Sequence, residues 1–359
     1  MRIADVRVQI VEFERAPYHW CDDLPVPPTR VRSPLLRIRT DEGLEGQCFG
    51  AGDVVDAGIG AVRALLVGED PMNRERIWHR FWKAARWHGF RGRLGTVDIA
   101  LWDLFGKAVD QPVYRLLGGF RDEIPAYAST LTLDSVEEYA DLARSVVERG
   151  YTAIKLHIWG TVRKDYQACK AVRDAVGPEV TLMLDASSMY TLEEAEWMGH
   201  ALEELDYAFF EEPIDFFNLS GLAHLRGRLR IPLAVGEASD GSVVEAATHV
   251  KLGTGDIVIT DPLFKAGITG SIKTAHSWEA FGLRCKVHAA DVACLHTACA
   301  IPSCHYFESW VPEGFLQTPG IQTAATEVDA RGMVRPWERP GLGVEVDWDW
   351  IGSHTVATL

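Results

Sequence analysis

The chain opens with alternating apolar and charged positions. Residues 2–13 (RIADVRVQIVEF) and 34–48 (PLLRIRTDEGLEGQC) both show this period of two, and DEG in the second segment is a hairpin turn. The pattern predicts a twisted antiparallel sheet over residues 1–48. Residues 19–30 (HWCDDLPVPPTR), between the strands, are rich in proline and aromatic side chains, which is typical of an exposed loop long enough to form a lid.

Helical periodicity follows over residues 53–118. Thr96 and Asp98 open a run, VDIALWDLFGKAVDQPVYRLLGG, whose apolar residues recur every three or four positions before a Gly-Gly stop. We expect these helices to cover the first sheet and to complete a capping domain.

From about residue 124, short apolar β-type segments alternate with amphipathic helical stretches, which predicts a parallel sheet. Each of seven segments ends at, or one residue before, Asp, Glu or His: AIKLH (153–157), TLMLD (181–185), YAFFE (207–211), PLAVGE (232–237), DIVIT (256–260), RCKVH (284–288) and HYFE (305–308). The end residues recur about every 25 positions, and eight units of that length close a (β/α)8 barrel.

The fold class is therefore α/β, a (β/α)8-type or modified TIM barrel with an α+β capping domain built from the N-terminal region and the C-terminal tail. We expect the cap and its lid loop over residues 1–123, the barrel over 124–314, and a segment over 315–359 that returns to the cap. Within that segment, VDARGMV (328–334) is predicted to form a hairpin packed on the cap.

Composition narrows the function classes. Lys and Arg total 36 against 51 Asp and Glu, a net charge of −15, which disfavours binding to nucleic-acid phosphates. The sequence lacks the apolar stretch of a membrane span or secretory signal. The seven cysteines lack a CxxC pair, and the spacing of Cys294, Cys299 and Cys304 does not suit zinc. We expect a cytoplasmic protein with reduced, buried thiols and neither membrane nor nucleic-acid partners.

Residues at the ends of barrel strands face one mouth, where the active sites of such barrels lie. Asp185, Glu211 and Glu237 end three consecutive strands, and three carboxylates converging in a partly dry pocket repel one another unless a cation neutralises them. Oxygen ligands favour Mg²⁺, with Mn²⁺ as an alternative. Glu212 is the rival ligand, but alternation along the strand allows only one of the two adjacent glutamates to face the metal.

Histidines frame this candidate metal site. Lys155 and His157 are two positions apart and share one face of their strand. Asp261 and His288 follow adjacent strands, and a carboxylate bonded to an imidazole is a common acid/base dyad. Other histidines lie in helix-like stretches and are expected to be structural: His224, His249 and His276.

Together these motifs resemble the mandelate racemase subgroup of the enolase superfamily over essentially the whole chain. The matching elements are Lys155-Leu156-His157, Asp185, FFEEP with Glu211, VGE with Glu237, TDPLFKAGITG with Asp261, His288, Glu308, and ALWDLFGKAVDQPVYRLLGG in the cap. His157 stands where the racemase pattern has a second lysine, which argues against a symmetric two-base racemase. Ser187 occupies a place where asparagine is common.

The resemblance implies abstraction of the proton α to a carboxylate, giving an enediolate, with one Mg²⁺ per subunit. We expect dehydration of an acid sugar, an aldonate or aldarate, to a 2-keto-3-deoxy acid. The catalytic set would be Lys155, His157, Asp261, His288 and Glu308. In this set Lys155 would contact the substrate carboxylate, Glu308 would bond a carboxylate oxygen, and either histidine could be the base.

Substrate contacts are expected from the lid and from aromatic residues near strand ends: His19, Trp20, Trp159 and Trp310. Arg91, or Arg93 in the same cap loop (WHGFRGR, 87–93), could bind a second carboxylate. The resemblance also implies a homo-oligomer, between dimer and octamer.

Two alternatives remain. A racemase, epimerase or sugar-lactone cycloisomerase would use the same scaffold, and a non-catalytic barrel could serve as a binding protein. The superfamily's other large subgroup, which uses a lysine ending the sixth strand, fits less well because Asp261 stands there and Lys265 comes four residues later. GxGxxG after a strand, GxxxxGK[ST], HExxH and GxSxG are absent from the sequence, which weakens other enzyme classes.

Overall fold

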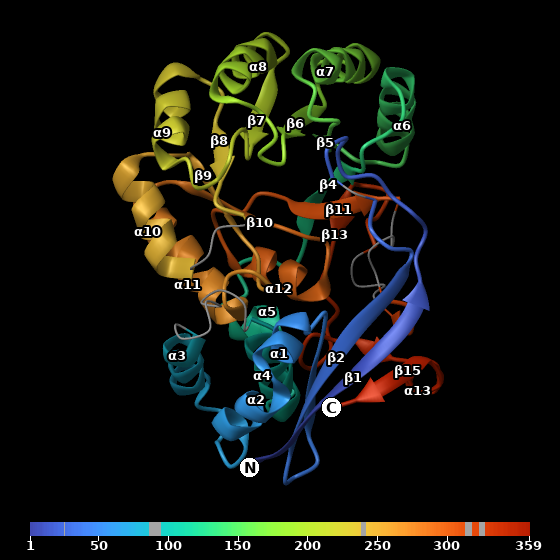
Figure 1. Cartoon of the computed structure of the whole chain (residues 1–359), viewed down its shortest axis with the longest axis vertical. Helices are drawn as coiled ribbons and strands as arrows, with labels where there is room; N and C mark the ends of the chain where they lie inside the picture. The colour runs from blue at the N-terminus through green and yellow to red at the C-terminus, as the bar shows by residue number, and fades with distance from the viewer. Residues whose placement is uncertain (25, 86–94, 238–241, 313–317, 323–326) are drawn as a thin grey trace.

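The computed structural model describes residues 1–359 except 25, 86–94, 238–241, 313–317 and 323–326 (Figure 1). A cap built on an antiparallel sheet lies below a parallel barrel in this view, and the C-terminal tail returns to the cap. Arg91, Arg93 and the rest of the predicted loop 87–93 lie outside the described residues. Among the helices that the structure describes, none combines the length and the apolar character needed to cross a membrane.

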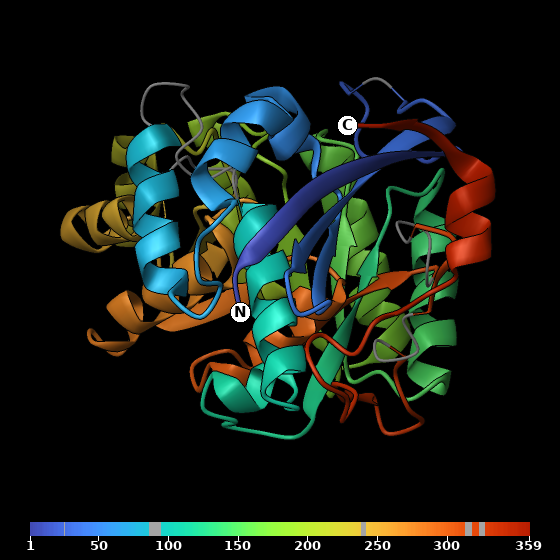
Figure 2. The same cartoon turned by 90° about the horizontal axis from the view of Figure 1, so that it is seen from below.

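The cap sheet has the order β15-β1-β2-β3, antiparallel as its alternating pattern predicts (Figure 2). Its inner face packs on the helix α4, and Gly46 allows the close approach, because a Cβ there would lie 2.0 Å from the Ala100 carbonyl oxygen. The N-terminal elements are β1 (Ile3–Glu14), β2 (Arg30–Thr40), β3 (Glu45–Phe49), α1 (Gly52–Ala57), α2 (Ile59–Leu66), α3 (Arg74–Ala85), α4 (Gly95–Ala108) and α5 (Val113–Leu116).

The barrel confirms the predicted fold class. In the described part of the chain, eight parallel strands run in the order β10-β9-β8-β7-β6-β5-β4-β11, and a hydrogen bond from Cys285 N to Ser303 O (3.2 Å) joins β10 to the segment that precedes β11. The strands are β4 (Ile124–Thr130), β5 (Ala153–His157), β6 (Thr181–Asp185), β7 (Tyr207–Glu211), β8 (Leu233–Val235), β9 (Ile257–Thr260), β10 (Arg284–Val287) and β11 (Phe307–Val311).

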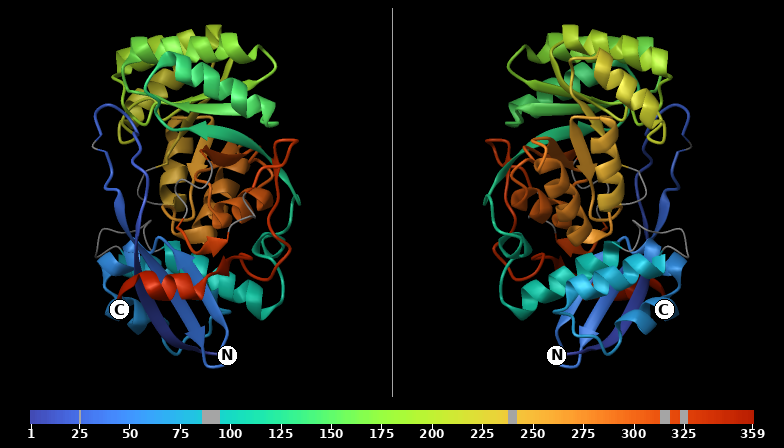
Figure 3. Two further views of the ribbon diagram at one scale, coloured as in Figure 1. Left: turned by 90° about the vertical axis from the view of Figure 1, so that its right-hand side faces the viewer. Right: turned by 90° about the vertical axis from the view of Figure 1, so that its left-hand side faces the viewer.

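Helices connect successive barrel strands and cover the barrel's outer face (Figure 3). They are α6 (Val136–Glu148), α7 (Val162–Val176), α8 (Leu192–Glu204), α9 (Leu219–Arg228), α10 (Ser242–Leu252), α11 (Gly267–Glu279) and α12 (Val292–Ala300). Alternation along each strand separates the two faces. Ile154 and Leu156 of β5 pack outward against this helical layer, whereas Ala153 belongs to an apolar layer inside the barrel.

Two predictions about the strands need correction. Glu308 does not end its strand, because the buried Ser-Trp-Val that follows continues β11 to Val311. The hairpin 328–334 does not pack on the cap: Met333 and Val334 of β13 pair with Pro125 and Ile124, where the free backbone at the start of β4 accepts an antiparallel partner.

The remaining tail elements are β12 (Ile321–Gln322), β13 (Met333–Val334), β14 (Glu345–Val346), α13 (Trp348–His354) and β15 (Thr355–Thr358). β15 pairs with β1 at the edge of the cap sheet, and Ile351 of α13 packs on the same sheet against Val11 and Leu35. All seven cysteines are free and buried, as expected.

The cap docks on the barrel through α4 and the start of α11. Asp98 accepts hydrogen bonds from Thr269 N (2.8 Å) and Thr269 Oγ1 (2.7 Å), and Trp102 Nε1 donates to Thr269 Oγ1 (2.9 Å). Trp78 Nε1 donates to Ala266 O (2.7 Å). The cap therefore fixes the loop that begins at Asp261, a residue of the candidate dyad.

Candidate active site

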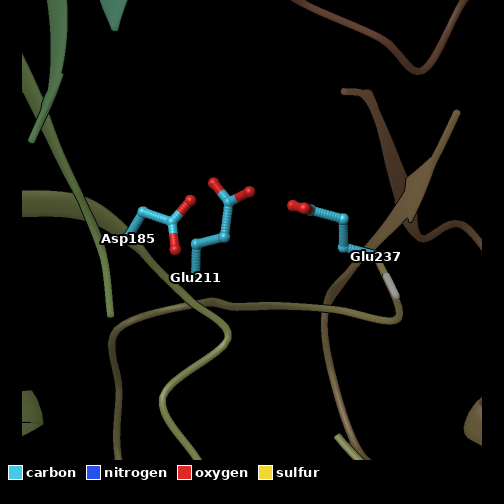
Figure 4. A group of neighbouring side chains, drawn as sticks. All are labelled: Asp185, Glu211 and Glu237. Carbon is cyan, nitrogen blue, oxygen red and sulfur yellow. The ribbon is translucent and has the colours of Figure 1, made fainter. Parts of the chain in front are cut away.

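Three carboxylates converge at the carboxyl end of the barrel. Asp185 and Glu211 end the paired strands β6 and β7, where they lie in register, and Glu237 follows β8. Each offers one oxygen that lies within 4.8 Å of the others, and Figure 4 shows the carboxylates pointing toward a common space. Ser187 N donates to Asp185 Oδ1 (2.8 Å), so the residue in the place where asparagine is common helps to orient this carboxylate.

The electrostatics of this group suit a divalent cation. Burial, together with the charge of Asp185, raises the pKa of Glu211 to about 7. Burial also opposes ionisation of Asp185, but Lys155 and His157 outweigh it and hold the pKa of Asp185 well below its usual range. A hard cation such as Mg²⁺ would take the place of the proton on Glu211, and all three side chains offer the oxygen ligands that it prefers.

Glu212 serves a different purpose from Glu211. Its carboxylate accepts hydrogen bonds from Gly236 N (2.6 Å) and Glu237 N (2.8 Å). Burial raises the pKa of Glu212 to about 8. Glu212 therefore holds the end of β8, which carries Glu237, while the structure groups Glu211 with Asp185 and Glu237.

Lys155 and Glu308 lie just below the trio and are fully buried. Lys155 Nζ lies 3.1 Å from Asp185 Oδ2, 3.1 Å from Glu211 Oε2 and 2.9 Å from Glu308 Oε1. Glu308 also accepts from Ser129 Oγ (2.8 Å) and Ala289 N (2.9 Å). Burial opposes the charge of Glu308, but Lys155 and Lys286 outweigh it, so its pKa lies well below the usual range.

Lys286 belongs to the same cluster, and sequence reasoning missed it. It lies on β10 two residues before His288, and its ammonium contacts Glu211 Oε1. The strand-end pattern predicts one site residue for each strand, with Lys155 beside His157 as the exception, and Lys286 does not end its strand. The spacing Lys286-Val287-His288, which repeats Lys155-Leu156-His157, is the signal that could have found it.

The two imidazoles flank the carboxylate row. His157 Nε2 lies 3.0 Å from Asp185 Oδ2, and its Nδ1 donates to the carbonyl oxygen of Thr130 (2.7 Å). His288 Nε2 lies 3.3 Å from Glu237 Oε1, and its Nδ1 lies 2.7 Å from Asp261 Oδ2. Burial disfavours the charged ring, but Glu237 and Asp261 raise the pKa of His288 to about 9. The geometry thus brings together the predicted dyad.

The lid loop covers His157. The Trp20 ring lies 4.7 Å from the His157 ring and 5.3 Å from the Trp310 ring, measured between centroids. Thr132 Oγ1 donates to Trp20 O (2.6 Å) and Asp22 N donates to Trp159 O (2.9 Å), which ties the loop to the barrel. Trp20 and Trp310, two of the predicted substrate contacts, therefore lie beside His157.

Two other predicted substrate contacts are not brought to the carboxylates. The Trp159 indole is buried in the outer core against Tyr139. Alternation would place it on the inward face with Lys155 and His157, but β5 ends at His157, so the alternation of the strand no longer fixes its direction. His19 is half-buried on the lid, with Nε2 3.9 Å from Asp22 Oδ1. Neither side chain has a recorded contact with the imidazoles or the trio.

Comparison with known proteins agrees with this arrangement. Residues 29–118 match the mandelate racemase / muconate lactonizing enzyme N-terminal domain, and residues 138–350 match the enolase C-terminal domain-like family. D-Glucarate dehydratase from Agrobacterium tumefaciens, whose crystal structure was determined in complex with magnesium, is 35% identical, with a TM-score of 0.93 over 99% of this chain and 100% of that chain.

Curated relatives carry more than one activity. Arabinonate dehydratase of Saccharolobus solfataricus is 32% identical over 86% of this chain and 87% of its own length. D-Galactarolactone cycloisomerase of Agrobacterium fabrum is 36% identical over 58% of each chain. Since both domains match, the chain belongs to the mandelate racemase / muconate lactonizing enzyme family of the enolase superfamily.

Proposed function

We propose that the protein is a Mg²⁺-dependent dehydratase of an acid sugar. The observation that carries this proposal is the row Asp185–Glu211–Glu237 with an imidazole at each end: His157 Nε2 lies 3.0 Å from Asp185 and His288 Nε2 lies 3.3 Å from Glu237. Asp185, Glu211 and Glu237 would hold the metal. When bound, the divalent cation supplies the positive charge that makes an α-proton acidic enough to remove.

The Nδ1 atoms of His157 and His288 have different partners, which supports a base role for one histidine and an acid role for the other. Since His157 Nδ1 donates to the Thr130 carbonyl, Nε2 is the ring nitrogen that would accept the α-proton. Nε2 now contacts Asp185 Oδ2 (3.0 Å), and it would become free for this role when Asp185 holds the cation. Asp261 stabilises the protonated ring of His288, which can donate a proton to the leaving β-hydroxyl. The α C–H and β C–O bonds break, water leaves, and the resulting enol tautomerises to a 2-keto-3-deoxy acid.

Substrate contacts in this proposal come from Trp20 and Trp310, whose rings lie beside His157. Lys155 is fully buried and is paired with Glu211 and Glu308, so in this proposal it acts through these carboxylates rather than through the predicted contact with the substrate carboxylate. The relatives named as arabinonate and D-glucarate dehydratases favour an aldonate or aldarate as substrate.

A second candidate is an isomerase on the same scaffold. Imidazoles on both sides of one site could remove a proton from one face of a carbon and return it to the other, and the cycloisomerase relative makes this reaction class relevant. The dissimilar Nδ1 partners favour dehydration, since they suit one acid and one base rather than two equivalent bases.

The test is to incubate purified protein with Mg²⁺ and a panel of aldonates and aldarates, and to detect keto acids with semicarbazide. We expect one or a few substrates to react. In D₂O, His288→Asn should keep exchange of the α-proton but lose dehydration, whereas His157→Asn should lose both.

His224→Asn is the matched control, because His224 is an exposed histidine paired with Glu196 on the outer helices. It should retain full turnover. An isomerised product without any keto acid would favour the second candidate, and neither exchange nor product with any acid sugar would contradict both.

A further inference from the structure

A second Lys-x-His sequence lies across the barrel from the first. Lys286-Val287-His288 on β10 repeats Lys155-Leu156-His157 on β5. Two residues of separation along a strand place both side chains on the same face, so each lysine lies one layer deeper in the barrel than its histidine. Lys286 is only 5% exposed, which makes its charge costly unless it is balanced.

The two lysines and two glutamates form a closed ring of ion pairs. Lys155 Nζ lies 3.1 Å from Glu211 Oε2 and 2.9 Å from Glu308 Oε1. Lys286 Nζ contacts Glu211 Oε1 and lies 3.7 Å from Glu308 Oε2. Each glutamate therefore meets both lysines through different oxygens, and this fixes the orientation of the Glu211 carboxylate. The Tyr127 ring lies 5.7 Å from Lys155 Nζ and 5.9 Å from Lys286 Nζ.

The ring of ion pairs affects the net charge that an incoming anion would meet. The two lysines offset Glu211 and Glu308, and a divalent cation would offset Asp185 and Glu237, so the charges of these four carboxylates are then balanced. A substrate carboxylate adds negative charge to this site, and removal of the α-proton adds more. Without Lys286 the substrate would meet an uncompensated carboxylate through a weakly screening interior.

We propose that Lys286 is a positioning residue that, through its ion pairs with Glu211 and Glu308, supplies the positive charge needed for a carboxylate anion to bind beside the cation. The inference rests on the proposed metal-dependent function. A purely structural ion pair would affect stability and would not distinguish a cation from an anion as ligand. The role proposed for Lys286 predicts different effects on the two ligands. Removing its positive charge should weaken the binding of an anion but not the binding of a cation.

The experiment is calorimetric titration of the full chain, first with MgCl₂ and then, in saturating Mg²⁺, with tartrate and with glycolate as dianionic and monoanionic hydroxy acids. For Lys286→Met we expect about tenfold or greater weakening of tartrate binding, a smaller loss for glycolate, and Mg²⁺ affinity equal to or above that of the wild type. Lys286→Arg should keep tartrate affinity. Lys170→Met removes an exposed lysine paired with Asp174 on α7 and should change neither affinity.

Wild-type tartrate affinity in Lys286→Met, or a loss of Mg²⁺ affinity as large as the loss of tartrate affinity, would overturn the inference. So would a wild type that binds Mg²⁺ but no tartrate. If Lys286→Met does not fold, Lys286→Gln, whose amide still donates to Glu211, carries the same expectations. The titration reports binding and does not depend on product formation, so a protein that behaves as expected here but dehydrates no acid sugar would refute the proposed reaction and leave the role of Lys286 intact.

Discussion

Neighbouring residues of one type can have separate tasks when a strand ends between them. Glu211 is the last residue of β7 and faces the barrel mouth, whereas Glu212 has a positive φ of 40° and turns its carboxylate to the backbone of Gly236 and Glu237. Both glutamates are buried, so substituting each in turn distinguishes the proposed metal ligand, Glu211, from Glu212, which supports the ligand Glu237.

This difference gives a prediction at the residue scale. Glu211→Gln should weaken Mg²⁺ binding by about a hundredfold or more, because it removes a charged ligand. Glu212→Gln should weaken Mg²⁺ binding by no more than about tenfold. The amide oxygen can still accept from Gly236 N, and Glu212 supports the ligand Glu237 without binding the metal itself. Calorimetric titration with MgCl₂ measures both variants. The reverse order of losses would identify Glu212 as the ligand.

At the scale of elements, docking of α4 on α11 connects the cap to the loop that begins at Asp261. Asp98 is buried there and accepts two hydrogen bonds from Thr269, and Gly267 packs so closely that a Cβ would lie 2.3 Å from Asp98 atoms. The lid, tied through Trp20 and Asp22, is the second connection between cap and barrel mouth. Weakening either should affect the site without touching the carboxylates.

Asp98 should also make stability depend on pH. Burial raises its pKa from 3.8 to about 7, so the folded chain keeps a proton that the unfolded chain loses. The contribution to stability is therefore present at low pH and is lost as pH rises from about 4 to about 7, by at most about 1.4 kcal/mol per pH unit.

The check is urea denaturation of wild type and Asp98→Asn at about pH 5.5 and about pH 8. Since the amide side chain of this variant cannot titrate, its free energy of unfolding relative to that of the wild type should be higher at the upper pH. Parallel pH dependence of the two proteins would show that Asp98 ionises normally in the folded state.

For the whole molecule, the sequence pattern predicted what is set by local periodicity. The strand segments ending at His157, Asp185 and Glu211 match the observed strands, because period-two alternation and the strand-end rule of barrels act at short range. The cap sheet was predicted for the same reason, although its β15 edge depends on pairing between the two ends of the chain.

Contacts between distant segments were harder to predict. Trp159 looked like a mouth residue but is in the outer core, and the 328–334 turn pairs with β4 rather than with the cap. The Lys-Val-His spacing places Lys286 on the same face as His288, but its ion-pair partners Glu211 and Glu308 come from other strands and follow only from the assembled barrel.

The central claim is that one divalent cation is held by Asp185, Glu211 and Glu237 between two imidazoles. The most direct measurement is anomalous X-ray scattering from crystals of the protein grown with MnCl₂. We predict a single strong peak in contact with one oxygen from each of the three carboxylates. Crystals that contain manganese but show no peak among these side chains, or show it bound by other residues, would contradict the account.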